Sequence, residues 1–105
     1  MGEKDYIRSL RPGRDRVRYY HLTEGKRVVE FLIQYEALIE GKWRAVVRYD
    51  SAHGDPHKDI LHPDGSQSKE YFPGWSNAHV LTYGQEDIGK RWREYRRAYV
   101  REMRG

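Results

Sequence analysis

Apolar and polar residues alternate along much of the first half of the chain. Between residues 27 and 39 the odd positions include Phe31, Ile33 and Tyr35, and the even positions include Glu30, Gln34 and Glu36. A period of two residues is typical of a strand that buries one face. Similar runs precede and follow this one, so the pattern predicts an antiparallel meander over residues 16–50.

Two glycines mark the turns of this meander. Gly25 and Gly41 both stand in the tripeptide Glu-Gly-Lys between strand-like runs. A type I turn followed by a left-handed residue favours glycine at that last position, so we expect a positive φ at both. The predicted pairs are Leu22–Lys26 and Leu38–Lys42 at the turns, and Val17–Phe31 and Ile33–Val47 further along the strands. This register keeps one face of the sheet apolar.

The C-terminal quarter of the chain has a helical period instead. A stripe with spacings of three and four residues indicates one helix face. Its members are Leu81, Gly84, Ile88, Trp92, Tyr95 and Tyr99. We expect a helix over residues 78–103, capped by Ser76 or Asn77. The opposite side of that helix is basic and carries Lys90, Arg93, Arg97, Arg101 and Arg104.

The fold class that these patterns predict is α+β. We expect an antiparallel β-meander of four to five strands, with one long C-terminal helix packed on one face. The short runs 57–62 and 67–72 are the candidates for the last two strands. Residues 1–14 show little periodicity and are expected to form a flexible basic arm. Residues 15–105 then make a single α+β domain, as the length of 105 residues favours.

Charge and composition narrow the functional classes. The formal net charge is +4, and both ends of the chain are basic around a slightly acidic middle. Arginine outnumbers lysine fourteen to six, which suits contacts with phosphate or carboxylate groups. The absence of cysteine excludes disulfides, thiolate nucleophiles and cysteine-based zinc sites. No apolar run approaches the about 20 residues that span a bilayer, so we expect a cytoplasmic protein with no membrane contact.

The side chains that carry chemistry gather in residues 48–62, which hold three of the five histidines. Metal-independent RNA cleavage needs a base, an acid and a cation on the phosphate, and two imidazoles can exchange the first two roles near neutral pH. The candidate catalytic residues are Arg48, Asp50, His53 and His57. Lys58 is an alternative cation. The candidate nucleic-acid-binding residues are Lys58, Arg93, Arg97 and Arg101.

Two other interpretations of the histidine-rich loop stay open. In an extended loop, His53, Asp55, His57 and Asp59 point the same way, which permits mixed ligation of a divalent metal. Alternatively, the histidines only hydrogen-bond the loop together. Our prediction includes no metal and no cofactor.

The block Arg48-Tyr49-Asp50-Ser51-Ala52-His53-Gly54, followed by Pro56-His57-Lys58-Asp59, resembles a group of small prokaryotic proteins. That group is similar to the TumE-type toxins of toxin–antitoxin systems. The resemblance implies a toxin-like or RNA-processing protein whose partners are RNA and a cognate antitoxin-like protein, and a homodimer is compatible with it. The alternative is a non-enzymatic module that binds nucleic acid or protein through its basic N- and C-terminal segments.

Overall fold

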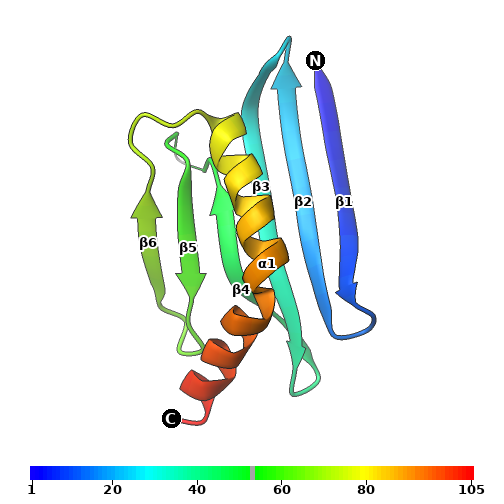
Figure 1. The fold of residues 1–105 in the computed structure, drawn as a ribbon, viewed down its shortest axis with the longest axis vertical. Coiled ribbons are helices and arrows are strands. Elements are labelled where there is room, and N and C mark those ends of the chain that lie inside the picture. The colour runs from blue at the N-terminus through cyan, green and yellow to red at the C-terminus, as the bar shows by residue number, and fades with distance from the viewer. Residues whose placement is uncertain (53) are drawn as a thin grey trace.

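The computed structural model describes residues 1–52 and 54–105. These residues form a sheet of six strands and one helix (Figure 1). The elements are β1 (Gly2–Arg11), β2 (Asp15–Glu24), β3 (Arg27–Ile39), β4 (Lys42–Asp50), β5 (His57–Leu61), β6 (Gln67–Tyr71) and α1 (Asn77–Met103). Every strand pairs antiparallel with its neighbour in sequence, so the sheet is a simple meander. The predicted α+β class and the C-terminal helix are confirmed.

The pattern of residues in the sequence did not predict strand β1. Residues 1–14 were expected to be a flexible arm, but Gly2–Arg11 pairs with β2 along its length. Tyr6 stacks on Tyr19 with ring centroids 4.7 Å apart, which holds this edge strand on the core. Most of β1 is exposed on both faces, and an edge strand of this kind has no alternation of apolar residues to reveal it.

Both hairpins turn more tightly than predicted. Glu40 and Gly41 have φ values of 52° and 76° and form a two-residue loop closed by Ile39 and Lys42. Positive φ at both central residues is the mark of the type I′ hairpin turn. The first hairpin also has a two-residue loop, with Gly25 at a φ of 59° in its first position. The predicted positive φ at both glycines is therefore confirmed, and the predicted three-residue loops are wrong.

A bulge in each hairpin explains why the predicted face is right although the register is wrong. A loop one residue shorter would by itself turn every side chain to the other face. The register shifts after each turn, between Leu22 and Thr23 and between Tyr35 and Glu36. Each bulge takes up one residue and returns the apolar positions to a common face. The observed pairs are Val17–Tyr35, Tyr19–Ile33, Ile33–Tyr49 and Tyr35–Val47.

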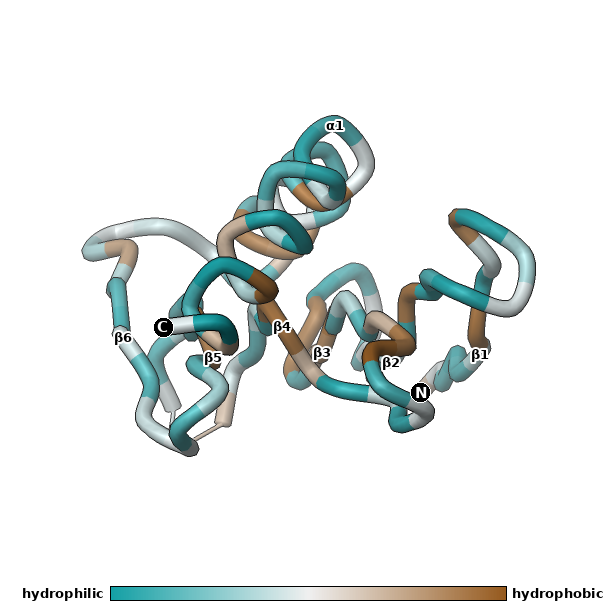
Figure 2. The backbone as a smooth tube through the Cα atoms, turned by 90° about the horizontal axis from the view of Figure 1, so that it is seen from below, coloured by the Kyte–Doolittle hydropathy of each residue, from teal (hydrophilic) through white to brown (hydrophobic). Residues whose placement is uncertain are grey.

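The helix covers one face of this curved sheet (Figure 2), where it packs on β3 and β4. Ser76 caps it, because its side chain accepts a hydrogen bond from the backbone N–H of His79. Ile88 and Trp92 are buried against the sheet, as predicted. Across residues 1–52 and 54–105, no helix combines the length and the apolar character that crossing a membrane requires.

The other face of the sheet is polar, yet part of it is buried. Glu36 accepts hydrogen bonds from Arg16 at 2.6 Å, from Arg18 at 3.2 Å and from Gln34 at 2.6 Å. Burial alone would raise the pKa of Glu36, but these hydrogen bonds hold that pKa below its usual value. The face without the helix, which we call the open face, therefore carries a partly buried ion-pair network around Glu36.

Candidate functional site

Strand pairing on the open face brings three titratable side chains together. Asp50 ends β4 and lies opposite His57, which begins β5. Because side chains alternate along a strand, His57 and Asp59 share a face of the sheet while Lys58 points to the other one. Asp50, His57 and Asp59 are 8%, 3% and 2% exposed. The open face therefore contains a buried cluster of one imidazole and two carboxylates.

The imidazole of His57 lies between the two carboxylates. Its Nε2 is 3.0 Å from Oδ1 of Asp50 and 3.4 Å from Oδ2 of Asp59. Its Nδ1 lies 3.0 Å from the backbone carbonyl oxygen of Asp55. A carbonyl oxygen only accepts hydrogen bonds, so Nδ1 carries the proton in this contact. That tautomer leaves Nε2 facing two acids.

One oxygen of this cluster has no hydrogen-bond partner. Among the buried side-chain nitrogen and oxygen atoms of the described residues, Oδ1 of Asp59 alone lacks one. Nζ of Lys69 stands 3.6 Å from it, outside hydrogen-bonding distance. Buried polar atoms nearly always find a partner, so an orphaned carboxylate oxygen indicates a functional or ligand-binding position.

A hollow borders the cluster on one side. It has a volume of about 550 Å³ and is lined by Tyr20, Val29, Glu30, Phe31, Leu32, Asp50, Ser51, Ala52 and Gly54. Asp50 therefore lies at the edge of the hollow, with His57 behind it. The ring of Tyr71 packs on His57 from β6, with the two ring centroids 5.7 Å apart. The hollow gives small solutes a route to Asp50.

The candidate catalytic residues do not all meet at this cluster. Arg48 donates from Nε to Oε1 of Gln34 at 2.7 Å and so belongs to the network around Glu36. Lys58 projects to the helix-covered face, where it donates to the hydroxyl of Tyr95 at 2.8 Å. His53 lies outside the described residues, so the distance between the two loop histidines stays a prediction. Asp50 and His57 are the two that the structure brings together.

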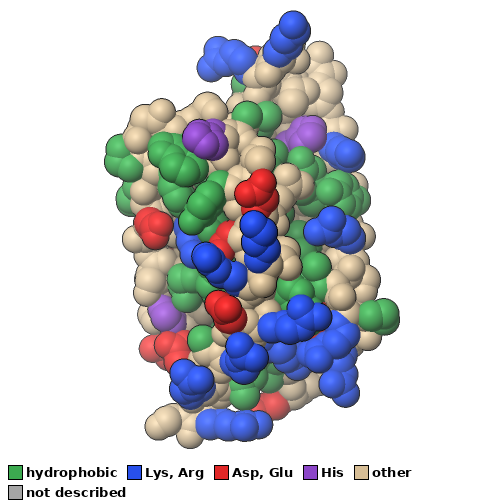
Figure 3. All heavy atoms as spheres, in the orientation of Figure 1, with side chains coloured by type: hydrophobic (Ala, Val, Ile, Leu, Met, Phe, Trp, Pro, Cys, Tyr) green, Lys and Arg blue, Asp and Glu red, His purple; other side chains and the backbone are tan. Residues whose placement is uncertain are grey.

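Arginines form an exposed basic surface on the C-terminal half of α1. Arg93, Arg97, Arg101 and Arg104 are exposed, and we call these four the arginine surface. In Figure 3, Lys and Arg side chains gather over the lower part of this face of the molecule, along this half of α1 and beside the ends of β1 and β2. Arg93 lies over the ring of Trp92, with its Cζ 4.3 Å from the ring centroid.

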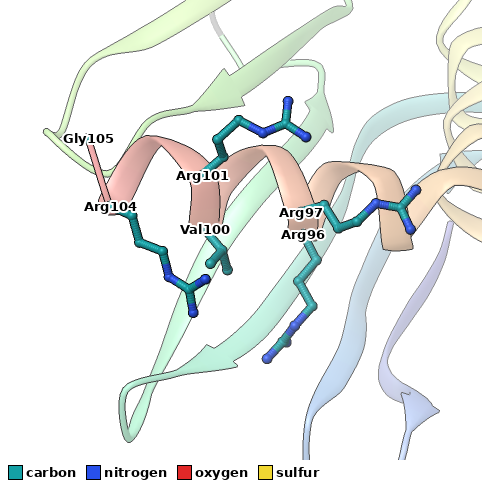
Figure 4. A pocket seen from close by; sticks show the side chains of 6 residues that line it. All are labelled: Arg96, Arg97, Val100, Arg101, Arg104 and Gly105. Atoms are coloured by element: carbon teal, nitrogen blue, oxygen red, sulfur yellow. The ribbon is translucent and has the colours of Figure 1, made fainter.

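A second hollow of about 550 Å³ opens at the end of the helix (Figure 4). Its lining is Arg96, Arg97, Val100, Arg101, Arg104 and Gly105. Arg96 and Arg104 extend to the same side with Val100 between them, and Arg101 extends the other way. Arg96 differs from the rest, since it donates to Oδ1 of Asp15 at 2.9 Å and to the carbonyl of Leu38 at 3.0 Å.

Comparison with known families gives one match. The family described as a domain of unknown function, DUF7718, matches residues 1–105. The chain belongs to the DUF7718 family. No curated protein and no solved structure matches the chain. The description of DUF7718 names no activity.

This DUF7718 chain contains a buried polar network that was not predicted from the sequence. Asp87 of α1 accepts hydrogen bonds from the hydroxyls of Tyr49 at 2.7 Å and Tyr95 at 2.5 Å. Nζ of Lys58 stands 3.6 Å from Oδ2 of Asp87, and Arg91 donates a hydrogen bond of 3.2 Å to Oδ1 of Asp87. Asp87 precedes Ile88 by one position and was left out of the apolar stripe because it is charged, and the packing of the helix shows that it faces the sheet. This network joins α1 to the sheet. It also explains why the side chain of Lys58 points toward the helix.

Proposed function

We propose that this protein binds RNA through the arginine surface, as a binding module. The observation that carries the proposal is the spacing of exposed arginines on one strip of α1. Arg93, Arg97 and Arg101 follow one another at four-residue intervals. An α-helix rises 1.5 Å per residue, so these side chains leave the helix about 6 Å apart along its axis. Such a row presents repeated guanidinium groups to a repeating phosphate backbone.

The charges of this strip are not neutralised by neighbours. Within residues 1–52 and 54–105, no carboxylate forms an ion pair with Arg93, Arg97 or Arg101. The acid at this end of the helix, Glu102, instead pairs with His62 at 3.0 Å. Guanidinium groups that have no carboxylate partner and stand on a rigid helix favour a polyanionic partner. RNA is the polyanion that the resemblance to TumE-type toxins implies.

Binding of a short fluorescent single-stranded RNA tests this proposal. The logarithm of the association constant should fall linearly with the logarithm of salt concentration, because each phosphate contact releases counterions. Reversing Arg93, Arg97 and Arg101 to Glu should lower the slope by about 2, at about 0.7 per contact on single strands. A matched control reverses Lys26, Arg27 and Lys42, which are exposed beside the two hairpin turns and lie outside the arginine surface.

Two outcomes contradict the proposal. One is binding that does not depend on salt. The other is an equal loss of affinity in the helix variant and in the hairpin control, which would mean that net charge alone matters. Duplex DNA and heparin, measured beside RNA, separate a preference for RNA from general affinity for polyanions.

RNA cleavage at the histidine-rich loop is the second candidate function. The observation that favours it is the hollow beside Asp50, which is large enough to admit part of a nucleotide. Against acid–base catalysis by His57 stands the burial of its ring behind Asp50. We therefore expect RNA cleavage and growth arrest, if they occur, to depend on His53 and Asp50. An assay of wild type against His53→Ala and Asp50→Asn measures both, and unchanged activity in both variants excludes this site.

A further inference from the structure

Nε2 of His57 faces two carboxylates, and the RNA-binding proposal gives this cluster no role. Nδ1 donates to the carbonyl of Asp55, so the second ring nitrogen is either a lone pair or the N–H of an imidazolium. A lone pair directed at the carboxylates of Asp50 and Asp59 is repulsive. A bound cation at Nε2 would relieve this repulsion. The geometry of the cluster supports this arrangement.

The spacing of the ligand atoms fits a metal ion. The distances from Nε2 are 3.0 Å to the oxygen of Asp50 and 3.4 Å to that of Asp59. In a site with metal–ligand bonds of about 2.0–2.2 Å, adjacent ligand atoms stand about 3.0–3.5 Å apart. One potential ligand atom from each of the three residues lies within 4.8 Å of the others. The third side of this triangle, between the two carboxylate oxygens, is therefore no longer than 4.8 Å.

The buried carboxylate of Asp59 is a second, independent observation. The side chain of Asp59 is 3% exposed, and its Oδ1 has no hydrogen bond. An imidazolium at His57 leaves this oxygen as it is, whereas an ion bound by the Asp59 carboxylate supplies it with a positive charge nearby. Lys69, at 3.6 Å, sits at the rim and balances the second negative charge.

We propose that Asp50, His57 and Asp59 bind one divalent transition-metal ion. One imidazole nitrogen and two carboxylate oxygens form a donor set that suits Zn²⁺ or Mn²⁺ and is poorly suited to a soft, thiolate-seeking ion. The ion joins the end of β4 to the start of β5 and therefore stabilises the connection between them. Asp50 borders the hollow, which provides the entry path and room for water on the open side of the ion.

Metal titration of chelator-treated protein tests this site. Isothermal titration with ZnCl₂ and MnCl₂ should show one ion per chain, and thermal unfolding should move to a higher temperature as metal is added. MgCl₂ is expected to bind more weakly because Mg²⁺ rarely takes an imidazole ligand. Co²⁺ in place of Zn²⁺ should give visible absorption bands that report nitrogen and oxygen ligation in the unaltered chain.

Near-isosteric variants locate the ion. Asp59→Asn and His57→Gln should each weaken binding about 100-fold or more, since even residues behind the ligands cost up to that factor. His62→Gln is the matched control, because His62 also contacts a carboxylate, that of Glu102, but lies outside the cluster. It should bind metal as the wild type does.

Three results overturn the proposal. The first is no binding and no thermal shift at millimolar metal, which leaves an imidazolium bridging two aspartates. The second is full binding in folded Asp59→Asn and His57→Gln proteins. The third is loss of binding in His62→Gln, which places the ion elsewhere. If a cluster variant does not fold, the stoichiometry and Co²⁺ spectrum of the wild type and of His62→Gln still decide.

Discussion

The hydroxyl of Tyr49 donates a 2.7 Å hydrogen bond to Oδ2 of Asp87. The bond joins the middle of the sheet to the middle of the helix through a fully buried ring. Tyr95 donates to the same oxygen, so one carboxylate organises two phenols. Burial first, and then the hydrogen bond to Asp87, raise the pKa of both tyrosines above its usual value. Both phenols therefore stay protonated and able to donate at any pH near neutrality.

Removal of Asp87 should be strongly destabilising. Asp87→Ala leaves two buried hydroxyls without their acceptor and Lys58 without its counter-ion, at a cost of about 3–5 kcal/mol. Tyr49→Phe removes one donor only and should cost about 1–3 kcal/mol. Urea unfolding measures both. Glu86→Ala, at the exposed neighbouring position, should change stability by less than about 0.5 kcal/mol. A similar effect at Asp87 and Glu86 would contradict the network.

Acid should destabilise the protein through two carboxylates. Burial would raise the pKa of Asp87, but hydrogen bonds from Tyr95 and Tyr49 and the nearby Lys58 hold it below its usual value, and the pKa of Glu36 is lowered in the same way. Because the unfolded chain takes up these protons near pH 4, at higher pH than the folded chain does, the stability is full above that pH and is lost as the pH falls further.

Urea unfolding between pH 7 and pH 3 measures this loss. Asp87→Asn should lower stability at pH 7 and flatten the dependence on pH, because one of the two groups no longer titrates. Parallel curves for wild type and variant would show that Asp87 does not contribute.

The two helix glycines should respond oppositely to alanine. A Cβ at Gly84 would lie 2.8 Å from Cγ and 2.9 Å from Cδ1 of Tyr49, so Gly84→Ala should destabilise by about 1–3 kcal/mol despite its better helix propensity. Gly89 is exposed and has open space where a Cβ would go, so Gly89→Ala should stabilise by about 1 kcal/mol. Thermal unfolding of the two variants measures whether each substitution raises or lowers stability. If both substitutions stabilise the protein, the helix is not as close to Tyr49 as the structure shows.

The adjacent residues Arg96 and Arg97 should have different roles. Arg96 should contribute to the stability of the fold, and Arg97 should contribute to RNA binding. Arg96→Ala removes the hydrogen bonds to Asp15 and to the carbonyl of Leu38 and should cost about 1–3 kcal/mol of stability. Arg97→Ala should leave stability within about 0.5 kcal/mol and reduce the salt dependence of RNA binding by about 0.7. Chemical unfolding and RNA titration of the same two proteins make the comparison. An RNA defect in Arg96→Ala with none in Arg97→Ala would reverse the assignment.

The second hairpin should tolerate a better turn residue. Glu40 adopts a φ of 52°, which costs a residue with a Cβ roughly 1–2 kcal/mol. Glu40→Asn places the favoured Asn-Gly pair in the type I′ turn and should raise stability by about 0.5–1 kcal/mol. Glu24→Asn serves as the control. Glu24 closes the turn of the first hairpin and does not have a positive φ, so this substitution should not stabilise the protein. Equal effects at both positions would show that the turn geometry is not the cause.

The sequence by itself determined the faces of the strands and the extent of the helix. Phe31, Ile33 and Tyr35 alternate at a period of two, and the stripe from Leu81 to Tyr99 repeats at the helical period. Each pattern is local, because the geometry of one element dictates which of its side chains share a face. The predicted helix over 78–103 and the observed Asn77–Met103 agree for this reason.

Only the tertiary structure decided the register, the edge strand β1 and the neighbours of the histidine-rich loop. Bulges change the pairing without changing the faces, so periodicity does not detect them. Asp50 and His57 meet because β4 and β5 pair, and Lys58 is separated from His57 because neighbouring side chains on a strand point to opposite faces. Asp87 was placed by packing between α1 and the sheet, which are distant in sequence. Contacts of that kind depend on how whole elements align in space, which no local pattern of residues records.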